Sequence, residues 1–436
     1  MTKSNRASAA TGLYWETNRM TKPYFDTNIP EAECPSILTE PRPEESRNVR
    51  LVGHSDLNGW GDAFQIRVKD GICYVMGSGL YTSFGLTVLD VSDPSKPTVI
   101  KQIKDSPSGR THKVLLVDDV LITNVDKKPG VDDPEVKGGL KIYDNSNPRD
   151  PKFVKYVETE GNGIHRCVYD FDRKLLYSGG YKDGCNGRVL IVHDMKDPHN
   201  PSLIGEGWVP GQNEAAGEEP TWDVNIVNKN QVDLHEAQPY GDYVTCAWRR
   251  GGYGMMDLTD PTKPKFLWRR NPYETHGWSP ACHTFLVPKG SEFGILTTET
   301  HTNNCAHPPA FATFFDMRDP MDPISISTFN PYPIDPITMR PKDMTWCQQG
   351  ARYGAHNTWQ WMNADDLLYL TWFNAGLRVV DWSNPFEPKE VGYYIPAGNK
   401  ERFCPQTNEV FVDRDTGLIY ISDRWGLGLH ILEYTG

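Results

Sequence analysis

One phrase recurs six times along this chain and restricts the folds that it can adopt. In each copy a short apolar run ends in Asp, a proline-containing turn follows with Asp or Asn just before its first proline, and a second apolar run comes next. The copies are GLTVLDVSDPSKPTVI (85–100), GLKIYDNSNPRDPKFV (139–154), GRVLIVHDMKDPHNPSLI (187–204), GYGMMDLTDPTKPKFL (252–267), AFATFFDMRDPMDPISI (310–326) and GLRVVDWSNPFEPKEV (376–391). Proline fixes φ and has no N–H to donate, so each copy predicts a strand, a turn and a second strand. With a shortened seventh copy at 426–434, the long period and short strands predict an all-β protein, a seven-bladed β-propeller.

The two ends of the chain are expected to meet in one blade. The last repeat offers three strands, NEVFVD (408–413), LIYIS (418–422) and GLHIL (428–432), and leaves no room for a fourth. The segment NVRLVG at 48–53 resembles the outer strands elsewhere and is predicted to close the ring, which removes open strand edges. The predicted domains are therefore a polar N-terminal arm (1–47) and the propeller (48–436). The arm could wrap the propeller, contact a second copy of the chain in a homo-oligomer, or stay disordered.

The wording of these repeats resembles a known family. The phrases LTVLD, RVLIVHD and LRVVD, together with the closing QTNEVFVDRDTGLIYISDRWGLGLHILEY, are similar to the LVIVD-repeat β-propellers. The resemblance covers roughly 50–436; it implies the fold and says little about chemistry. The arrangement is more distantly similar to selenium-binding proteins, which are metal-linked thiol oxidases, and to carotenoid cleavage oxygenases, which hold iron with four histidines on the propeller axis. No catalytic residue is carried over from either, because none of their local motifs matches here.

Composition excludes several classes of function. The formal net charge is −12 with no Lys/Arg stripe, which disfavours a nucleic-acid partner. No apolar run approaches the ~20 residues that a membrane span needs, and the N-terminus lacks a signal-peptide core. Nine cysteines without a C-x-x-C pair do not suggest a secreted disulfide framework, so we expect a cytoplasmic protein with free thiols. Nucleotide-binding loops are also absent from the sequence.

Histidines occupy the same position in five successive repeats. In an antiparallel blade the start of the innermost strand and the end of the second strand lie on one face, so the seven inner-strand heads should form a ring. These heads are Asp62, His112, His165, His235, His283, His356 and Asn408. A single buried histidine is usually a hydrogen-bonded packing residue. Five converging imidazoles instead favour a metal site, because without an ion they would repel when protonated and leave lone pairs unsatisfied when neutral.

The ring predicts a divalent transition metal held mainly by imidazole. Such ligands suit iron, copper, zinc or nickel, and the lack of Cys or Met at ring positions argues against a thiolate site. Iron or copper is preferred, with zinc as the alternative. Asp62 is either a carboxylate ligand or a residue that hydrogen-bonds the neighbouring blade.

Two further residues are predicted to reach the same mouth of the channel. The second strand of the fifth blade ends in TTETHTNNCAH, so Glu299 and His301 should project beside His283. Glu299 could orient a ligand or move a proton, and His301 could act as an acid or base. The alternative is that both are solvated loop residues. Glu236 follows His235 directly and is expected to be a packing or salt-bridge residue.

The substrate side is predicted to be aromatic. The candidate substrate-binding residues follow second strands and are Tyr181, Trp248, Arg249, Trp372, Asn374 and Arg424. Two inserts, 205–231 and 328–353, are long enough to be functional covers over this mouth. The aromatic residues with one or two arginines suggest that the substrate is an apolar or aromatic small molecule with an anionic or phenolic group. The alternative is that the tryptophans only pack the loops.

Three functions remain open from the sequence. The first is a metal-dependent oxidoreductase, similar to an oxygenase, that uses a histidine-held ion on an apolar or aromatic small molecule. The second is a hydrolase or lyase in which zinc or a similar ion lowers the pKa of bound water to about 7. The third is a non-catalytic scaffold in which a structural ion ties the blades together.

Overall fold

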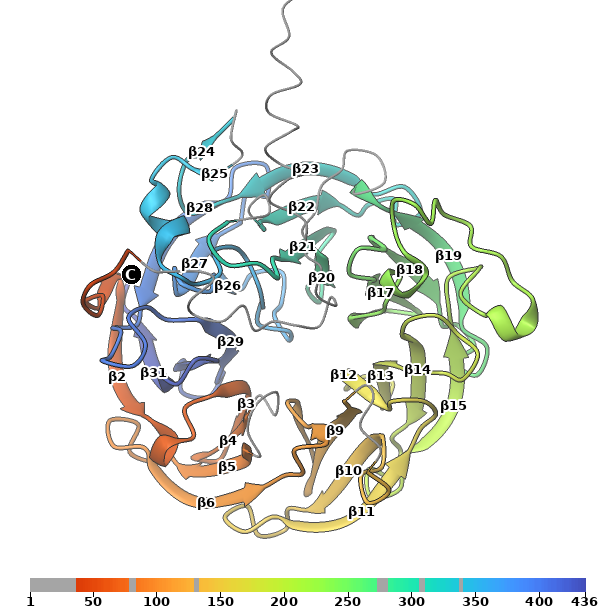
Figure 1. The fold of residues 1–436 in the computed structure, drawn as a ribbon, viewed down its shortest axis with the longest axis horizontal. Helices are drawn as coiled ribbons and strands as arrows, with labels where there is room; N and C mark the ends of the chain where they lie inside the picture. The colour runs from red at the N-terminus through yellow and green to blue at the C-terminus, as the bar shows by residue number, and fades with distance from the viewer. Residues whose placement is uncertain (1–36, 78–83, 129–132, 273–280, 306–309, 337–339) are drawn as a thin grey trace, which may run out of the picture.

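Seven small antiparallel sheets lie in a ring around a central axis (Figure 1). The computed structural model describes residues 37–77, 84–128, 133–272, 281–305, 310–336 and 340–436. The predicted seven-bladed β-propeller is confirmed. Most of the predicted N-terminal arm, residues 1–36, lies outside the described residues.

The first four blades follow one another along the chain. Blade 1 consists of β3 (Ala63–Lys69), β4 (Ile72–Gly77), β5 (Phe84–Asp90) and β6 (Thr98–Lys104). Blade 2 consists of β7 (Gly109–Arg110), β8 (Val114–Val117), β9 (Val120–Lys127), β10 (Gly139–Asp144) and β11 (Lys152–Glu158). Blade 3 consists of β12 (Ile164–Asp170), β13 (Leu175–Gly180), β14 (Val189–Asp194) and β15 (Ser202–Gly207). Blade 4 consists of β16 (Glu236–Tyr240), β17 (Tyr243–Ala247), β18 (Tyr253–Asp257) and β19 (Lys265–Arg270).

The last three blades include the strands from the N-terminal end. Blade 5 consists of β20 (Ala281–Leu286), β21 (Phe293–Glu299), β22 (Ala312–Asp316) and β23 (Ile324–Phe329). Blade 6 consists of β26 (Leu368–Thr371), β27 (Leu377–Asp381), β28 (Lys389–Ile395) and β1 (Glu45–Arg47). Blade 7 consists of β29 (Thr407–Val412), β30 (Ile419–Asp423), β31 (Gly428–Tyr434) and β2 (Val49–Ser55). The inner segment of blade 6 is irregular and bonds to β26 through a bridge between Thr358 and Leu370.

The aspartates of the repeated phrase shape its turns. Each one that ends a third strand accepts a hydrogen bond at Oδ1 from the backbone N–H two residues later; these are Asp90, Asp144, Asp194, Asp257, Asp316 and Asp381. The Asp or Asn before the first proline does the same; these are Asp93, Asn147, Asp197, Asp260, Asp319 and Asn384. Short side chains of this kind stabilise turns by bonding their own backbone two residues on. Two such turns in a row explain why the phrase recurs with its Asp and Pro positions intact.

The ring closes as predicted, between strands from opposite ends of the chain. β2 pairs with β31 from Val49 opposite Tyr434 to Ser55 opposite Leu429, and the two lie side by side in Figure 1. β1 adds to the outer edge of β28, with Glu45 opposite Ile395. Residues 45–47 of the predicted arm therefore belong to the propeller.

The two inserts carry the described helical turns. The 3-10 turns η3 (Glu214–Ala216) and η4 (Lys229–Gln231) lie in the first insert, and η5 (Met344–Gln348) lies in the second beside the short pair β24 (Ile334–Asp335) and β25 (Arg340–Pro341). A further turn, η2 (Leu57–Gly59), precedes β3. In Figure 1 β24 and β25 of the second insert lie at the rim. No helix among the described residues is long and apolar enough to cross a membrane.

The expectation that the cysteines are free thiols is wrong for one pair. Cys305 and Cys347 form a disulfide that joins the loop after β21 to η5. Both are buried, and their separation of 42 residues joins two loops that spacing alone did not pair. Six other described cysteines are free thiols.

Candidate metal centre

The structure brings the five histidines together as a continuous row of imidazoles. All five side chains are buried, and each lies just before or within the first three residues of the inner segment of its blade. The ring centroids of successive pairs from His112 to His356 lie 4.8, 5.2, 4.0 and 4.4 Å apart. One repeat thus supplies one imidazole, and ring closure sets their spacing.

Hydrogen bonds at Nδ1 fix the tautomer of three of these histidines. Nδ1 of His235 lies 2.9 Å from the carbonyl oxygen of His283, and Nδ1 of His356 lies 2.6 Å from the carbonyl oxygen of Asn408. Nδ1 of His165 lies 2.7 Å from a carboxylate oxygen of Asp126. Carbonyl and carboxylate oxygens only accept hydrogen bonds, so Nδ1 carries the proton and Nε2 keeps its lone pair. This is the usual state of a metal-binding histidine.

His283 reaches the same tautomer through a hydroxyl. Its Nδ1 lies 2.9 Å from Oγ1 of Thr284, and that hydroxyl donates its own proton to Oε2 of Glu236 at 3.1 Å. The oxygen of Thr284 can therefore only accept from the imidazole. Glu236 also pairs with Arg166, which bears out the salt-bridge prediction, and accepts a hydrogen bond of 3.0 Å from Gln360.

Burial keeps the ring histidines neutral. Loss of hydration, with added repulsion from neighbouring cations, lowers the pKa of all five well below the ordinary value. A neutral imidazole is the form that binds a metal.

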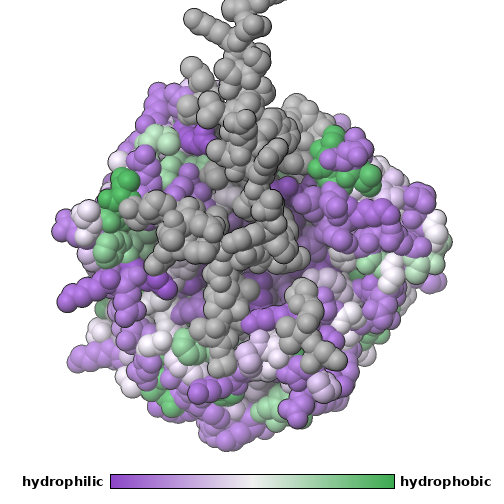
Figure 2. Space-filling model, in the orientation of Figure 1, coloured by the Kyte–Doolittle hydropathy of each residue, from purple (hydrophilic) through white to green (hydrophobic). Residues whose placement is uncertain are grey.

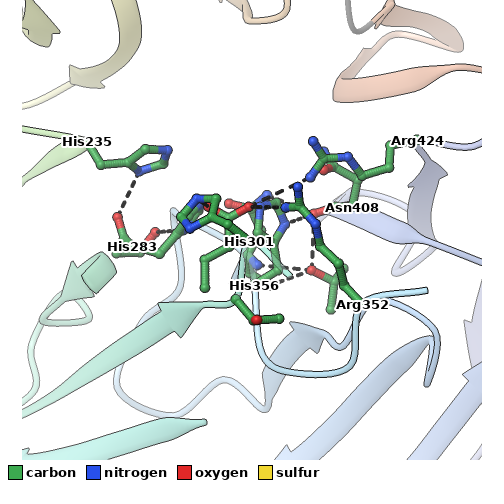
Figure 3. A network of polar contacts seen from close by, with 12 residues as sticks. His235, His283, His301, Arg352, His356, Asn408 and Arg424 are labelled. Carbon is green, nitrogen blue, oxygen red and sulfur yellow. Dashed lines mark hydrogen bonds and ion pairs between the residues drawn. The ribbon is translucent and has the colours of Figure 1, made fainter. Parts of the chain in front are cut away.

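Glu299 stands at the centre of the remaining polar contacts. Its Oε2 lies 3.0 Å from Nε2 of His301, and its Oε1 lies 3.0 Å from Arg352 and 3.7 Å from Arg424. Figure 3 shows these two arginines and His301 gathered beside the histidine row. Burial raises the pKa of Glu299, whereas its contacts with His301, His356 and His283 lower it, and the net direction is well below the ordinary value. The pairing with Arg352 at 3.0 Å also favours the ionised carboxylate.

Two lone pairs face each other between Glu299 and His356. Nε2 of His356 carries no proton in the tautomer set by Asn408, yet it lies 3.5 Å from Oε1 of Glu299. Oε1 also accepts a hydrogen bond of 3.0 Å from Arg352, and a cation between Oε1 and Nε2 would satisfy both of these acceptors. Ligands about 2.1 Å from one tetrahedral ion would lie about 3.4 Å apart, close to what is seen.

The potential ligand atoms form two clusters among the described residues. One consists of His283, Glu299 and His356, and the other of His235, Glu236 and His283. Both carboxylates already have partners, since Glu236 contacts Arg166, Gln360 and Thr284, and Glu299 contacts His301, Arg352 and Arg424. Each cluster contains two histidines and one glutamate, whereas the sequence predicted a set held mainly by imidazole with Asp62 as the candidate carboxylate.

The other ring positions have different surroundings. Nε2 of His165 lies 3.5 Å from a guanidinium nitrogen of Arg249, and Nδ1 of His112 lies 3.4 Å from the amide nitrogen of Asn124. An amide nitrogen also lies beside His356, where Nδ2 of Asn357 is 3.0 Å from Nδ1, so the contrast with His165 lies in the charge that faces Nε2. Asp62 is half-buried and belongs to neither cluster.

The predicted substrate residues divide into two groups. Arg249 and Arg424 reach the site, and half-buried Tyr181 lies in the field of Arg249, Asp126 and Asp233. The remaining three are core residues. Trp248 and Trp372 have no exposed surface and lie in hydrophobic clusters, while Asn374 is fully buried and donates to the backbone of Trp346 at 2.9 Å. In this arrangement the predicted aromatic wall cannot contact a substrate, because the strands and inserts pack over both tryptophans.

Sequence reasoning missed Arg352, Asp126 and a second layer of charge. Arg352 precedes His356 by four residues and carried no signal. The second layer lies directly after the ring heads and consists of Lys113, Arg166, Glu236 and Glu409, all buried, with Arg67 in electrostatic range. The sequence did indicate this second layer, because charged residues in otherwise apolar inner strands are rarely buried without a partner.

Comparison with known proteins identifies the repeat. The LVIVD repeat family matches residues 61–105 and 365–395, which are blade 1 and the three main strands of blade 6. Two segments of this seven-bladed β-propeller therefore match the LVIVD repeat. The Asp of the LVIVD phrase is the residue that forms the first turn described above. No curated protein matches this chain.

Solved structures resemble this chain in fold alone. A protein from Lactobacillus plantarum is 14% identical over 82% of this chain and 87% of its own, with a TM-score of 0.52. The periplasmic gluconolactonase of Pseudomonas aeruginosa is 12% identical over 79% of this chain and 87% of its own, with a TM-score of 0.52. Raptor from Chaetomium thermophilum is 10% identical over 84% of this chain and 27% of its own, with a TM-score of 0.51.

Proposed function

We propose that this propeller is a metal-dependent enzyme that holds one divalent ion between His283, Glu299 and His356. The preferred reaction is an oxidation of a small molecule with oxygen, using iron or copper. The facing lone pairs of His356 and Glu299, 3.5 Å apart, are the observation that carries the proposal. A cation is the natural occupant of such a pair.

The donor set favours a catalytic ion over a structural one. Two imidazoles and one carboxylate leave coordination positions open, and this combination is typical of non-haem iron enzymes that use oxygen. Structural ions usually have four protein ligands. When bound, the ion would supply Lewis acidity and redox chemistry at the mouth of the channel.

His301 is the proposed proton-handling residue. Its Nε2 lies 3.0 Å from Glu299 and 3.2 Å from Arg249, and its side chain is 16% exposed. Burial lowers its pKa to about 4, even though Glu299 opposes that shift. The neutral imidazole has a lone pair that can take a proton, and this low pKa makes it a weaker base than an ordinary histidine.

A metal-dependent hydrolase is the second candidate. The same ligands can hold zinc, and a distant structural relative is a gluconolactonase, a hydrolase. In that case the ion would lower the pKa of bound water, and His301 would accept its proton.

Metal analysis with absorption spectroscopy separates the candidates. The purified chain would be analysed for iron, copper and zinc, and its spectrum recorded with and without oxygen. One iron or copper per chain, with an oxygen-sensitive spectrum, supports the oxidoreductase. One zinc with no oxygen response supports the hydrolase. If the chain retains no divalent metal after incubation with each ion, the proposed centre is wrong.

A further inference from the structure

A cleft lies at the end of the propeller axis opposite the histidine row. Residues 169–173, 239–242, 286–291 and 360–363 line it, and its volume is about 650 Å³. The first three ranges contain the turns that follow the inner strands β12, β16 and β20, and the fourth leads into β26. Because the histidines lie at the beginning of these inner segments, the turns at their far ends open on the other face. This far cleft has the size of a typical small-molecule pocket.

Three aromatic side chains stand together in the wall of the far cleft. The ring of Phe171 contacts Tyr169 and Trp361 edge to face, with centroids 4.7 and 5.7 Å away. Phe171 is nevertheless 57% exposed, so much of its ring is free for a further contact. On the face viewed in Figure 2, by contrast, hydrophobic residues outside the grey parts form only small patches in a mostly hydrophilic surface. An exposed ring beside two others in a cleft is typical of a site for an aromatic ligand.

The charged residues of the far cleft are already paired. Asp172 lies 2.7 Å from Lys289, and Arg173 lies 4.0 Å from Asp242. Asp170 accepts hydrogen bonds of 3.0 and 3.1 Å from two backbone N–H groups of its own turn. Among the described residues of the lining, no charge is left without a partner. The cleft therefore favours a neutral ligand over an ion.

Gln360 connects the far cleft to the metal centre. It lines the cleft, and its Nε2 donates a hydrogen bond of 3.0 Å to Oε1 of Glu236. The other oxygen of Glu236 accepts a hydrogen bond of 3.1 Å from Thr284, and that hydroxyl accepts from Nδ1 of His283 at 2.9 Å. Three consecutive hydrogen bonds thus join the cleft to a proposed metal ligand.

Arg67 ties the same glutamine to the aromatic wall. It donates a hydrogen bond of 3.1 Å to Oε1 of Gln360, and its guanidinium lies 4.4 Å from the ring centroid of Trp361. Arg67 and Gln360 are both buried. A ligand that packs against Trp361 therefore bears on the residues that hold Glu236 in place.

We infer that the far cleft binds a neutral aromatic small molecule, stacked against Phe171, whose presence changes the metal centre through Gln360 and Glu236. The effect on the metal rests on the proposed function, whereas binding of the aromatic molecule does not. A ligand that orders Gln360 lowers the entropy cost of ordering Glu236 and His283 around the ion, so each ligand should favour the other.

Calorimetry on the full metal-free chain tests the binding. Indole is the neutral aromatic probe, cyclohexanol is a neutral non-aromatic control, and benzoate and benzylammonium are charged aromatic controls. We expect indole to bind at one site per chain, more tightly than any of the three controls. No indole binding, or tighter binding of benzoate or benzylammonium, would overturn the inference. So would a dimer of the chain that F171A dissociates, because a second copy would then fill the cleft.

A pair of exposed phenylalanines locates the binding. F171A should weaken indole binding about 2- to 10-fold, which corresponds to the loss of one aromatic pair. F386A is the matched control, since Phe386 is 56% exposed and contacts one ring, that of Phe293, in blade 6. It should bind indole as the unchanged chain does. Equal affinity in F171A and F386A would place indole elsewhere and contradict the inference.

Titration with Co²⁺ in the presence and absence of saturating indole tests the link. Indole should raise Co²⁺ affinity about fivefold or more, and Co²⁺ should raise indole affinity by the same factor. Q360L should bind indole but lose this coupling. T284V breaks the chain at its other end and should lose the coupling as well, whereas T284S should keep it. Coupling that survives in both Q360L and T284V would contradict the proposed route.

The two proposals fail separately. A chain that binds indole but no Co²⁺ would contradict the metal centre and leave the far cleft as a ligand site. A chain that binds Co²⁺ but no indole would contradict the far cleft alone. Binding of both without any mutual effect would overturn the link through Gln360.

Discussion

Two sides of the histidine row occupy equivalent positions and face opposite charges. Nε2 of His356 lies 3.5 Å from the carboxylate of Glu299, and Nε2 of His165 lies 3.5 Å from the guanidinium of Arg249. Both imidazoles begin inner segments, and both are buried. The difference comes from the second strands, since β21 ends in a glutamate and β17 is followed by an arginine. Inner strands supply the potential ligands, and second strands decide which of them can bind a cation.

The largest expected effect is loss of the ion from one side only. His283→Ala, Glu299→Gln and His356→Ala should each reduce bound metal to background, because each removes one of three ligands. His112→Ala is the matched control from the other side and should retain the metal. The measurement is metal content after equilibration with excess ion and removal of the free ion. Equal losses in His112→Ala would show that the whole row binds the ion and that the comparison fails.

The disulfide between Cys305 and Cys347 joins the loop that follows Glu299 to the second insert. Replacing Cys305 and Cys347 with Ala should lower the free energy of unfolding by about 4 kcal/mol, the chain-entropy expectation for a loop of this length. Urea denaturation of the metal-free chain measures this change, with Cys185→Ala as a control at a free thiol. Metal affinity should also fall, because the loop joins the end of β21 to the insert that carries Arg352. An unchanged denaturation midpoint would argue against a structural disulfide.

The hydroxyl of Thr284, which accepts from His283, gives a further test of the difference between the two sides of the histidine row. Thr284→Val preserves shape but removes the acceptor for Nδ1 of His283, so metal affinity should fall about 10–100-fold. Thr284→Ser keeps the hydroxyl and should restore affinity. On the other side, Asp126→Asn alters the Nδ1 partner of His165 and should leave metal affinity unchanged. Titration with Co²⁺, followed by its visible spectrum, reports both affinity and ligand geometry. A Thr284→Val chain that binds as Thr284→Ser does would remove this role.

The smallest expected effect is on the pH dependence of stability. His112 on one side of the row and His356 on the other should change it in the same direction. Burial depresses the pKa of His112 and His356 in the folded chain, so only the unfolded chain takes up protons just below pH 6.5. Stability of the metal-free protein is therefore complete above pH 6.5 and declines below it, by at most about 1.4 kcal/mol per pH unit for each histidine. His112→Asn and His356→Asn should each flatten this decline between pH 6.5 and 5, measured by urea denaturation. A slope that neither variant changes would mean that these imidazoles are protonated in the folded chain.

Much of the fold followed from turn chemistry in the sequence. The repeated Asp and Pro positions predicted strand, turn and strand, and the short seventh copy predicted closure by NVRLVG, which is part of β2. These features are local, or depend on counting repeats, and a single sequence contains both. The disulfide was missed because its two cysteines meet only when the second insert packs beside the loop after β21.

The sequence predicted where the site residues lie better than it predicted which residues they contact. Repeat alignment placed the histidines, Glu299, His301, Arg249 and Arg424 at one mouth, because equivalent strand ends share a face. It could not show that Glu299 faces His356, which depends on side-chain direction across two blades. Trp248 and Trp372 were expected at the same mouth, yet their side chains turn into the cores between strands. Loop position fixes a backbone, and packing decides where a large apolar side chain goes.

The pairing of β2 with β31 has a consequence for how the molecule is made. Val49 leaves the ribosome long before Tyr434, its partner, and at about 5–20 residues per second the delay is about 20–80 s. During that time β2 has an unpaired edge that could join another nascent chain. The first six blades must form as an open arc, and the ring closes only when β31 of the last blade pairs with β2. Residues inserted next to Val49 would therefore impair ring closure, which is the last step of folding, rather than the formation of the first blades.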